Sequence, residues 1–154
     1  HIFAVFRLLY ILYFMQVITF FQLIQSANYN IKKFVESELR KHKQNDIRYS
    51  HFEILRLLLS HGYINMEDLA KQINKHKSTI TALVKKLLKK NLVSVKKIGK
   101  DDRKQFVDLT EEGKKFVCYV NNIEQKLYLK LHHSLCPNDQ KYVVEALTKL
   151  NNTF

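Results

Sequence analysis

Lysines are concentrated in one stretch of this sequence. Residues 65–104 contain eleven lysines and one arginine against four acidic residues, a net charge of +8 out of +12 for the whole chain. The segment that follows, residues 105–154, carries six charges of each sign. A charge that served only solubility would be spread evenly, whereas a localised one is typical of a surface that binds phosphates. We therefore expect residues 65–104 to bind duplex DNA.

The chemistry within this stretch divides into two sets of side chains. Phosphate contacts would supply most of the affinity, and base edges in the major groove would be read from the first half of a basic helix. A lysine on a helix is more often simply solvated, so the prediction concerns the cluster as a group. The predicted base-reading residues are Lys77, Ser78, Thr79, Thr81, Ala82 and Lys85. The predicted phosphate contacts are Lys75, Lys86, Lys89, Lys96, Lys97 and Lys104.

Two helices separated by a short turn are predicted to position these side chains. Asn65 is the expected N-cap of the first helix, with Asp68 in the reach-back position of a capping box. Residues 74–76 fit the turn, and the second helix begins near Lys77. Apolar residues at helical spacing are expected to face the core, namely Ile80, Leu83, Val84, Leu87 and Leu88. Asn91 is the expected left-handed residue at the end of that helix.

A β-hairpin is predicted to follow the basic helix. Residues 92–98 and 105–109 are rich in β-branched and aromatic residues, and residues 99–102 form the turn between them. Tyr63 and Ile64 form a short strand that borders the hairpin. Thr110 is the expected cap of a long helix that reaches about Leu135. Helix, turn, helix and hairpin in this order predict a winged helix-turn-helix in a mostly α fold.

The same residues resemble the MarR family of bacterial transcriptional regulators. The resemblance rests on Lys77-Ser-Thr-Ile-Thr-Ala-Leu-Val, on Asn91-Leu-Val, and on the hairpin run Asp101-Asp-Arg-Lys-Gln-Phe-Val-Asp-Leu-Thr-Glu-Glu-Gly113. It implies a homodimeric DNA-binding repressor that a small-molecule effector releases. It also implies that Arg103 enters the minor groove and that Asp101 supports it. The family normally has glycine where Asn91 stands, and asparagine tolerates the same backbone conformation.

Three segments follow from the pattern and the resemblance together. Residues 1–45 are expected to be a helical dimerisation region, residues 46–110 the DNA-binding lobe, and residues 111–154 the C-terminal dimerisation helices. In the lobe, Ser50 and Glu53 form a capping box, and Gly62 ends that helix. Pro137 begins a last helix, residues 137–151, whose apolar residues are expected to face inward: Val143, Val144, Leu147 and Leu150.

The N-terminal residues 2–24 are almost entirely apolar and leave three interpretations open. They form a helix buried in a dimer interface, a membrane-associated segment, or an unnatural or disordered extension. A natural start at Met15 would make residues 1–14 an appendage. The second interpretation gives the alternative function, a membrane-associated winged-helix adaptor anchored through residues 2–24. We expect a cytoplasmic protein without stable membrane contact.

The remaining residues that could bind a ligand or a metal give weaker signals. Tyr29, Tyr49, Phe52 and Tyr63 are predicted either to line a pocket for a small aromatic effector or to pack in the core. Cys118 and Cys136 do not form a disulfide framework, and His132 and His133 diverge too far on a helix to bind one metal ion. We find no catalytic motif in the sequence, so we expect no enzyme activity, no cofactor and no metal; a metal sensor remains the rival.

Overall fold

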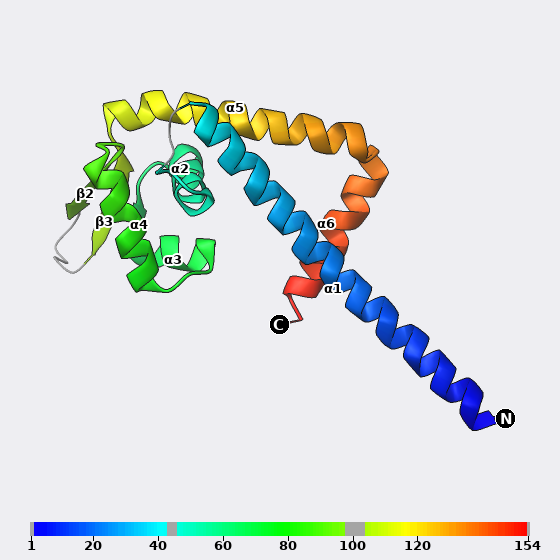
Figure 1. The fold of residues 1–154 in the computed structure, drawn as a ribbon. Coiled ribbons are helices and arrows are strands. Elements are labelled where there is room, and N and C mark those ends of the chain that lie inside the picture. Colours follow the sequence, from blue (N-terminus) through cyan, green and yellow to red (C-terminus); the bar gives the residue numbers. More distant parts are fainter. Residues whose placement is uncertain (1, 43–45, 98–103, 154) are drawn as a thin grey trace. The chain divides into compact units, whose positions relative to one another are not determined.

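The computed structural model describes residues 2–42, 46–97 and 104–153, with side chains of the first helix described from Tyr13 onward (Figure 1). The described residues form six helices and three strands. The chain consists of two compact units, His1–Tyr49 and Ser50–Phe154. The mostly α fold with a small β-hairpin, predicted from the sequence, is confirmed.

The first unit is dominated by one continuous helix, α1 (Ile2–Lys41). Many apolar side chains of its described part are exposed, including Tyr13, Phe14 and Leu23. Within the residues whose side chains are described, no helix combines the length and the apolar character needed to cross a membrane. The carboxylate of Glu36, within α1, accepts a hydrogen bond of 3.3 Å from the backbone N–H of Tyr49, the last residue of the first unit.

The first helix of the second unit is α2 (Tyr49–His61), which contributes to its core from Ser50 onward. The helix starts one residue before the expected cap, so the prediction that Ser50 caps it is wrong. Phe52, Ile54, Leu55 and Leu58 are buried. Gly62 ends the helix as predicted: its φ is +73°, and its N–H donates to the carbonyl oxygen of Leu58 at 3.0 Å. A positive φ favours glycine because a Cβ would be strained there.

A three-stranded antiparallel sheet holds the hairpin to this core. Its order is β1 (Ile64–Asn65), β3 (Gln105–Leu109) and β2 (Val93–Lys97). Val107 in β3 is fully buried and lies opposite Ile64 on one side and Val95 on the other. The short strand that was expected at Tyr63–Ile64 is found one residue later.

The helix-turn-helix consists of α3 (Met66–Ile73) and α4 (Lys77–Lys89). Asn91, beyond the end of α4, has the left-handed backbone that was predicted for it (φ 56°). Asn74 in the turn has one too (φ 53°). Ile80, Val84 and Leu87 are buried, but Leu88 is 40% exposed, so its assignment to the core is wrong. Leu88 lies at the edge of the apolar stripe, where a side chain is turned partly toward solvent.

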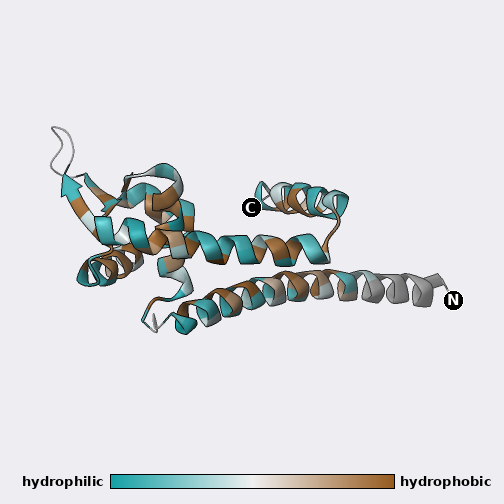
Figure 2. Cartoon of the chain, turned by 90° about the horizontal axis from the view of Figure 1, so that it is seen from above, coloured by the Kyte–Doolittle hydropathy of each residue, from teal (hydrophilic) through white to brown (hydrophobic). Residues whose placement is uncertain are grey.

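Two helices complete the chain, α5 (Glu111–Ser134) and α6 (Pro137–Asn151). Pro137 is the first residue of α6, as predicted. None of the side chains of α6, all of which are described, is buried, and Val143, Val144 and Leu147 are exposed. The expectation that these residues face inward is therefore wrong within a single chain. Figure 2 shows apolar residues recurring along this exposed helix, at the C-terminal end of the chain.

A close backbone approach joins the end of α4 to the start of α5. The Thr110 hydroxyl donates to the carbonyl oxygen of Asn91 at 2.5 Å and accepts from the N–H of Gly113 at 2.9 Å. The N–H of Thr110 donates to the carbonyl oxygen of Leu92 at 3.2 Å. A Cβ on Gly113 would overlap that same carbonyl oxygen and lie 2.9 Å from its carbon atom. Glycine is required here because two backbones meet.

We predict that Gly113→Ala lowers the free energy of unfolding by about 1–3 kcal/mol, the usual cost of overpacking. Alanine is the better helix former, so a loss of stability would isolate the steric cost against the Leu92 backbone. Urea denaturation measures the change. Asn121→Ala, at an exposed position of the same helix, is the matched control and should be neutral or slightly stabilising. Equal stabilities for both variants would contradict the close approach.

Candidate nucleic-acid interface

One face of α4 carries every residue that was predicted to read bases. Lys77, Ser78, Thr79, Thr81, Ala82 and Lys85 are all exposed. The opposite face, made by Ile80, Val84 and Leu87, is buried. Because residues three and four apart share one side of a helix, burial of the apolar stripe turns the lysines and hydroxyls outward together.

Further lysines surround this face. Lys89 continues it at the end of α4, Lys96 and Lys97 lie on β2, and Lys104 precedes β3; all four are exposed. Lys75 and Lys86 are half-buried. Lys96 forms an ion pair of 3.7 Å with Asp108 on the neighbouring strand. Asp101 and Arg103 lie outside the described residues, so their expected role in the hairpin stays a prediction.

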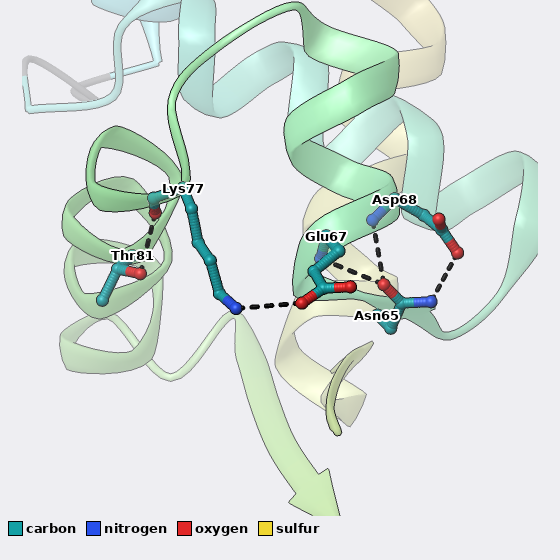
Figure 3. Close-up of polar contacts among 5 residues, drawn as sticks. All are labelled: Asn65, Glu67, Asp68, Lys77 and Thr81. Carbon is teal, nitrogen blue, oxygen red and sulfur yellow. Dashed lines mark hydrogen bonds and ion pairs between the residues drawn. The ribbon is translucent and has the colours of Figure 1, made fainter. Parts of the chain in front are cut away.

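The start of α3 is fixed by its capping residue (Figure 3). The side-chain oxygen of Asn65 accepts hydrogen bonds from the N–H groups of Glu67 at 3.0 Å and Asp68 at 2.9 Å, which confirms Asn65 as the N-cap. The carboxylate of Asp68 accepts from the side-chain amide of Asn65. The expected capping box differs in this detail, since Asp68 was expected to reach the Asn65 backbone.

An ion pair joins the two helices of the helix-turn-helix. The ammonium group of Lys77, at the start of α4, donates to the Oε1 atom of Glu67 at 3.0 Å (Figure 3). Both side chains remain about two-thirds exposed, at 66% and 65%. The hydrogen bond from Lys77 and the charge of Lys77 lower the pKa of Glu67, and the charges of Lys71 and Lys104 add to the effect.

A polar hollow of about 300 Å³ lies around this pair. Its lining comes from the start of α3, the first turns of α4 and the start of β3, and consists of Asn65, Met66, Glu67, Asp68, Lys77, Thr81, Lys104 and Gln105. The hydroxyl of Thr81 donates to the carbonyl oxygen of Lys77 at 2.9 Å, one turn earlier in the helix. Sequence patterns did not single out Glu67, because its partner is ten residues away across a turn.

The four aromatic residues that were predicted to line an effector pocket lie in different surroundings. Phe52 is buried in the core of the second unit. Tyr63 is 57% exposed and meets the ring of Phe106 edge-on, with 5.6 Å between the centroids. In the first unit, the ring of Tyr29 lies 5.9 Å from the Lys33 ammonium group, and that of Tyr49 lies 5.7 Å from the Lys32 ammonium group. Their role in binding an effector stays a prediction.

In the described part of the chain, no group of three or more histidine, cysteine or acidic side chains is arranged to hold a metal ion. Cys118 and Cys136 are exposed free thiols, and the sulfur of Cys136 accepts a hydrogen bond at the start of α6. The His132 ring meets the Tyr128 ring edge-on.

Comparison with known proteins adds independent findings. The model of the MarR family matches residues 47–105. An uncharacterised HTH-type transcriptional regulator of Bacillus subtilis, YfiV, is 30% identical over 109 residues, which are 69% of this chain. The chain spans 66% of the length of that relative.

Solved structures share the fold over a longer part of the chain. MepR of Staphylococcus aureus, in a complex with DNA, has a TM-score of 0.77 at 22% identity, covering 86% of this chain and 96% of MepR. BpsR of Bordetella bronchiseptica, whose DNA binding is regulated by 6-hydroxynicotinic acid, has a TM-score of 0.72 at 20% identity. The match covers 84% of this chain and 91% of BpsR. At these identities the likeness is one of fold.

We predict that Lys77→Gln raises the pKa of Glu67 toward the ordinary value of a glutamate. The lowered pKa means that the pair stabilises the fold above the pKa of unfolded glutamate and ceases to do so as the pH falls through the folded value. A carbon-13 NMR titration of the Glu67 carboxyl group measures the shift. Lys71→Gln, which removes a charge that lowers this pKa less, should move it less; an equal movement would contradict the direct pair.

Proposed function

This chain belongs to the MarR family, and on that premise we propose that it is a transcriptional regulator that binds duplex DNA sequence-specifically as a homodimer. The observation that carries the proposal is the exposed face of α4, where lysines and hydroxyls lie opposite a buried apolar stripe. A helix with this division of side chains can pack on its own domain with one face and enter the major groove with the other.

Affinity in this proposal comes mainly from phosphate contacts. Lys85, Lys86 and Lys89 form no ion pair with an acidic side chain of the described residues, so their charges are available to an external anion. Each lysine that meets a phosphate releases a counterion from DNA, and binding therefore weakens as salt rises. Lys75, Lys96, Lys97 and Lys104 extend the same basic surface onto the turn and the hairpin.

Sequence reading is assigned to the first half of α4. Ser78 and Thr79 offer hydroxyl groups, Thr81 and Ala82 offer methyl groups that fit the thymine methyl, and Lys77 and Lys85 offer donors for guanine acceptors. By resemblance to the family, Arg103 enters the minor groove with the support of Asp101. Arginine suits a narrow minor groove because its negative potential is enhanced.

Dimerisation is supported by apolar surface that a single chain leaves uncovered. On α6, Val144 is 64% exposed and Leu147 39%; on α5, Leu129 is 53% exposed and Leu131 49%. We assign residues 1–45 and 111–154 to dimerisation and residues 46–110 to DNA binding. A two-fold dimer would place its two α4 helices in half-sites about 34–36 Å apart on a roughly palindromic operator.

Regulation by an effector belongs to the same proposal. The dimer would act as a repressor by occupying promoter DNA, and a small aromatic ligand would release it by preferring a dimer whose lobes are wrongly spaced for B-form DNA. The candidates for contacting that ligand are Tyr29 and Tyr49 in the first unit and, separately, Phe52 and Tyr63 in the second. BpsR, which shares the fold, is a precedent for control of DNA binding by a small aromatic molecule.

Selection of bound fragments from genomic DNA tests the proposed function directly. The expected result is enrichment of fragments that share a roughly palindromic sequence, and the salt dependence of the best fragment then gives the number of phosphate contacts. Binding to every fragment alike, with no preference over heparin, would contradict sequence-specific regulation.

For the basic face of α4, we predict that Lys85→Ala weakens DNA binding and lowers the slope of log K against log salt by about one unit. Fluorescence anisotropy at several salt concentrations measures both quantities. Lys141→Ala, an exposed lysine on α6, is the matched control because it removes the same charge away from α4. An unchanged slope for Lys85→Ala would refute its contact with a phosphate.

For the dimer, we predict that the double variant Val144→Asp and Leu147→Asp is monomeric at concentrations at which the wild-type chain is dimeric. Charges placed in an apolar interface cost far more than charges in water. Light scattering coupled to gel filtration measures the mass. Lys141→Asp and Lys149→Asp, on exposed positions of the same helix, form the control pair. A wild-type monomer would refute the dimer outright.

A further inference from the structure

Glu67 is an acidic residue surrounded by basic ones. Lys77, Lys71 and Lys104 are the basic side chains whose charges lower the pKa of its carboxyl group. Asp68, the neighbouring acid, is occupied by the side-chain amide of Asn65 at the cap of α3. Glu67 is instead 65% exposed and directed at Lys77 (Figure 3). It therefore brings a negative charge to the part of the surface that is proposed to meet a polyanion.

The position of the Lys77 side chain is the informative feature. Lys77 is the first residue of α4, and its ammonium group spans the space between the two helices to reach Glu67 at 3.0 Å (Figure 3). The hollow around the pair is open to solvent-sized molecules, at about 300 Å³, and Lys104 borders it as well. The ammonium group of Lys77 is thus held by an internal partner before any external anion arrives.

We propose that Glu67 is a positioning residue that sets the DNA selectivity of this surface by holding Lys77 in an ion pair that DNA must replace. The inference rests on the proposed function. A duplex that presents a phosphate or base acceptor at the right place takes Lys77 from Glu67. On any other duplex Lys77 stays paired with Glu67, and the surface binds that DNA with one positive charge fewer. Weakening the wrong complexes is as effective for specificity as strengthening the right one.

The exposure of the pair makes this exchange feasible. An ion pair between two largely exposed side chains contributes little to stability, because water and salt screen it. Lys77 can therefore leave Glu67 without disrupting the helix-turn-helix. The start of α3 keeps its cap without Glu67, since the side chain of Asn65 accepts hydrogen bonds from two backbone N–H groups there.

A purely structural role for Glu67 predicts something different. An acidic residue in the first turn of a helix stabilises the helix dipole. Glu111 provides the matched case, since it lies in the first turn of α5 and forms an ion pair of 2.7 Å with Lys114. The hydrogen bond from Lys114 and the charge of Lys114 lower the pKa of Glu111, as Lys77 does for Glu67. Glu111 is not among the residues proposed to contact DNA, so only Glu67 should affect the salt dependence of binding.

The test compares Glu67→Gln with Glu111→Gln in the full chain, using the selected operator fragment and a random duplex. For Glu67→Gln on the random duplex we expect the slope of log K against log salt to steepen by about 0.9, which makes the affinity loss between about 50 and 200 mM salt roughly threefold greater. We also expect the random duplex to gain more affinity than the operator. Glu111→Gln should change neither quantity.

On the random duplex, an unchanged slope for Glu67→Gln, or the same change for both variants, would overturn the inference while leaving the proposed function intact. Wild-type protein that binds no duplex would contradict both the inference and the proposed function. A second measurement needs no variant: the pKa of the Glu67 carboxyl group, followed by carbon-13 NMR, should rise on operator binding, because Lys77 leaves and phosphates approach. A pKa that stays constant or falls would equally overturn the inference.

Discussion

The burial of one face of α4 is the constraint on which the rest of this structure depends. Ile80, Val84 and Leu87 cannot remain in the core unless the lysines and hydroxyls of the same helix point outward. The junction after α4 then fixes where the helix ends, because the backbones of Leu92 and Gly113 meet there and Thr110 bonds across it. A basic face is useful for reading a rigid duplex only if its backbone is held in place, and hydrophobic burial supplies that rigidity.

The charges on this surface do not all favour the binding of DNA. On α4, Lys85, Lys86 and Lys89 form no ion pair within the described residues, whereas Lys77 on the same helix is already paired with Glu67. Net charge alone would treat Glu67 as a small reduction of a large positive total. Its position in α3, beside the Lys77 side chain, gives it a different meaning. In our proposal Lys77 reads bases, and an acid beside it would penalise every complex in which Lys77 finds no better acceptor.

The exposed apolar surface of the chain has a different explanation from its positive charge. The helices α5 and α6 leave leucine, valine and tyrosine side chains in solvent, and no side chain of α6 is buried. Apolar surface of this extent is unusual for a chain that works alone. The proposed homodimer would account for it with residues that the fold of one chain does not use, and it would double the basic surface without requiring new contacts to DNA.

By itself, the sequence determined the elements and their order, because caps, turns and periodicity act within a few residues: Asn65, Gly62, Asn91, Thr110 and Pro137 all begin or end elements as predicted. It also placed the exposed lysines of α4, since helical spacing relates them to the buried stripe. Local patterns failed where the outcome depends on packing between elements, as for Leu88 and for the exposed valines of α6. The pairing of Glu67 with Lys77 was decided only by the tertiary structure, because a turn brings together two residues that sequence spacing leaves unrelated.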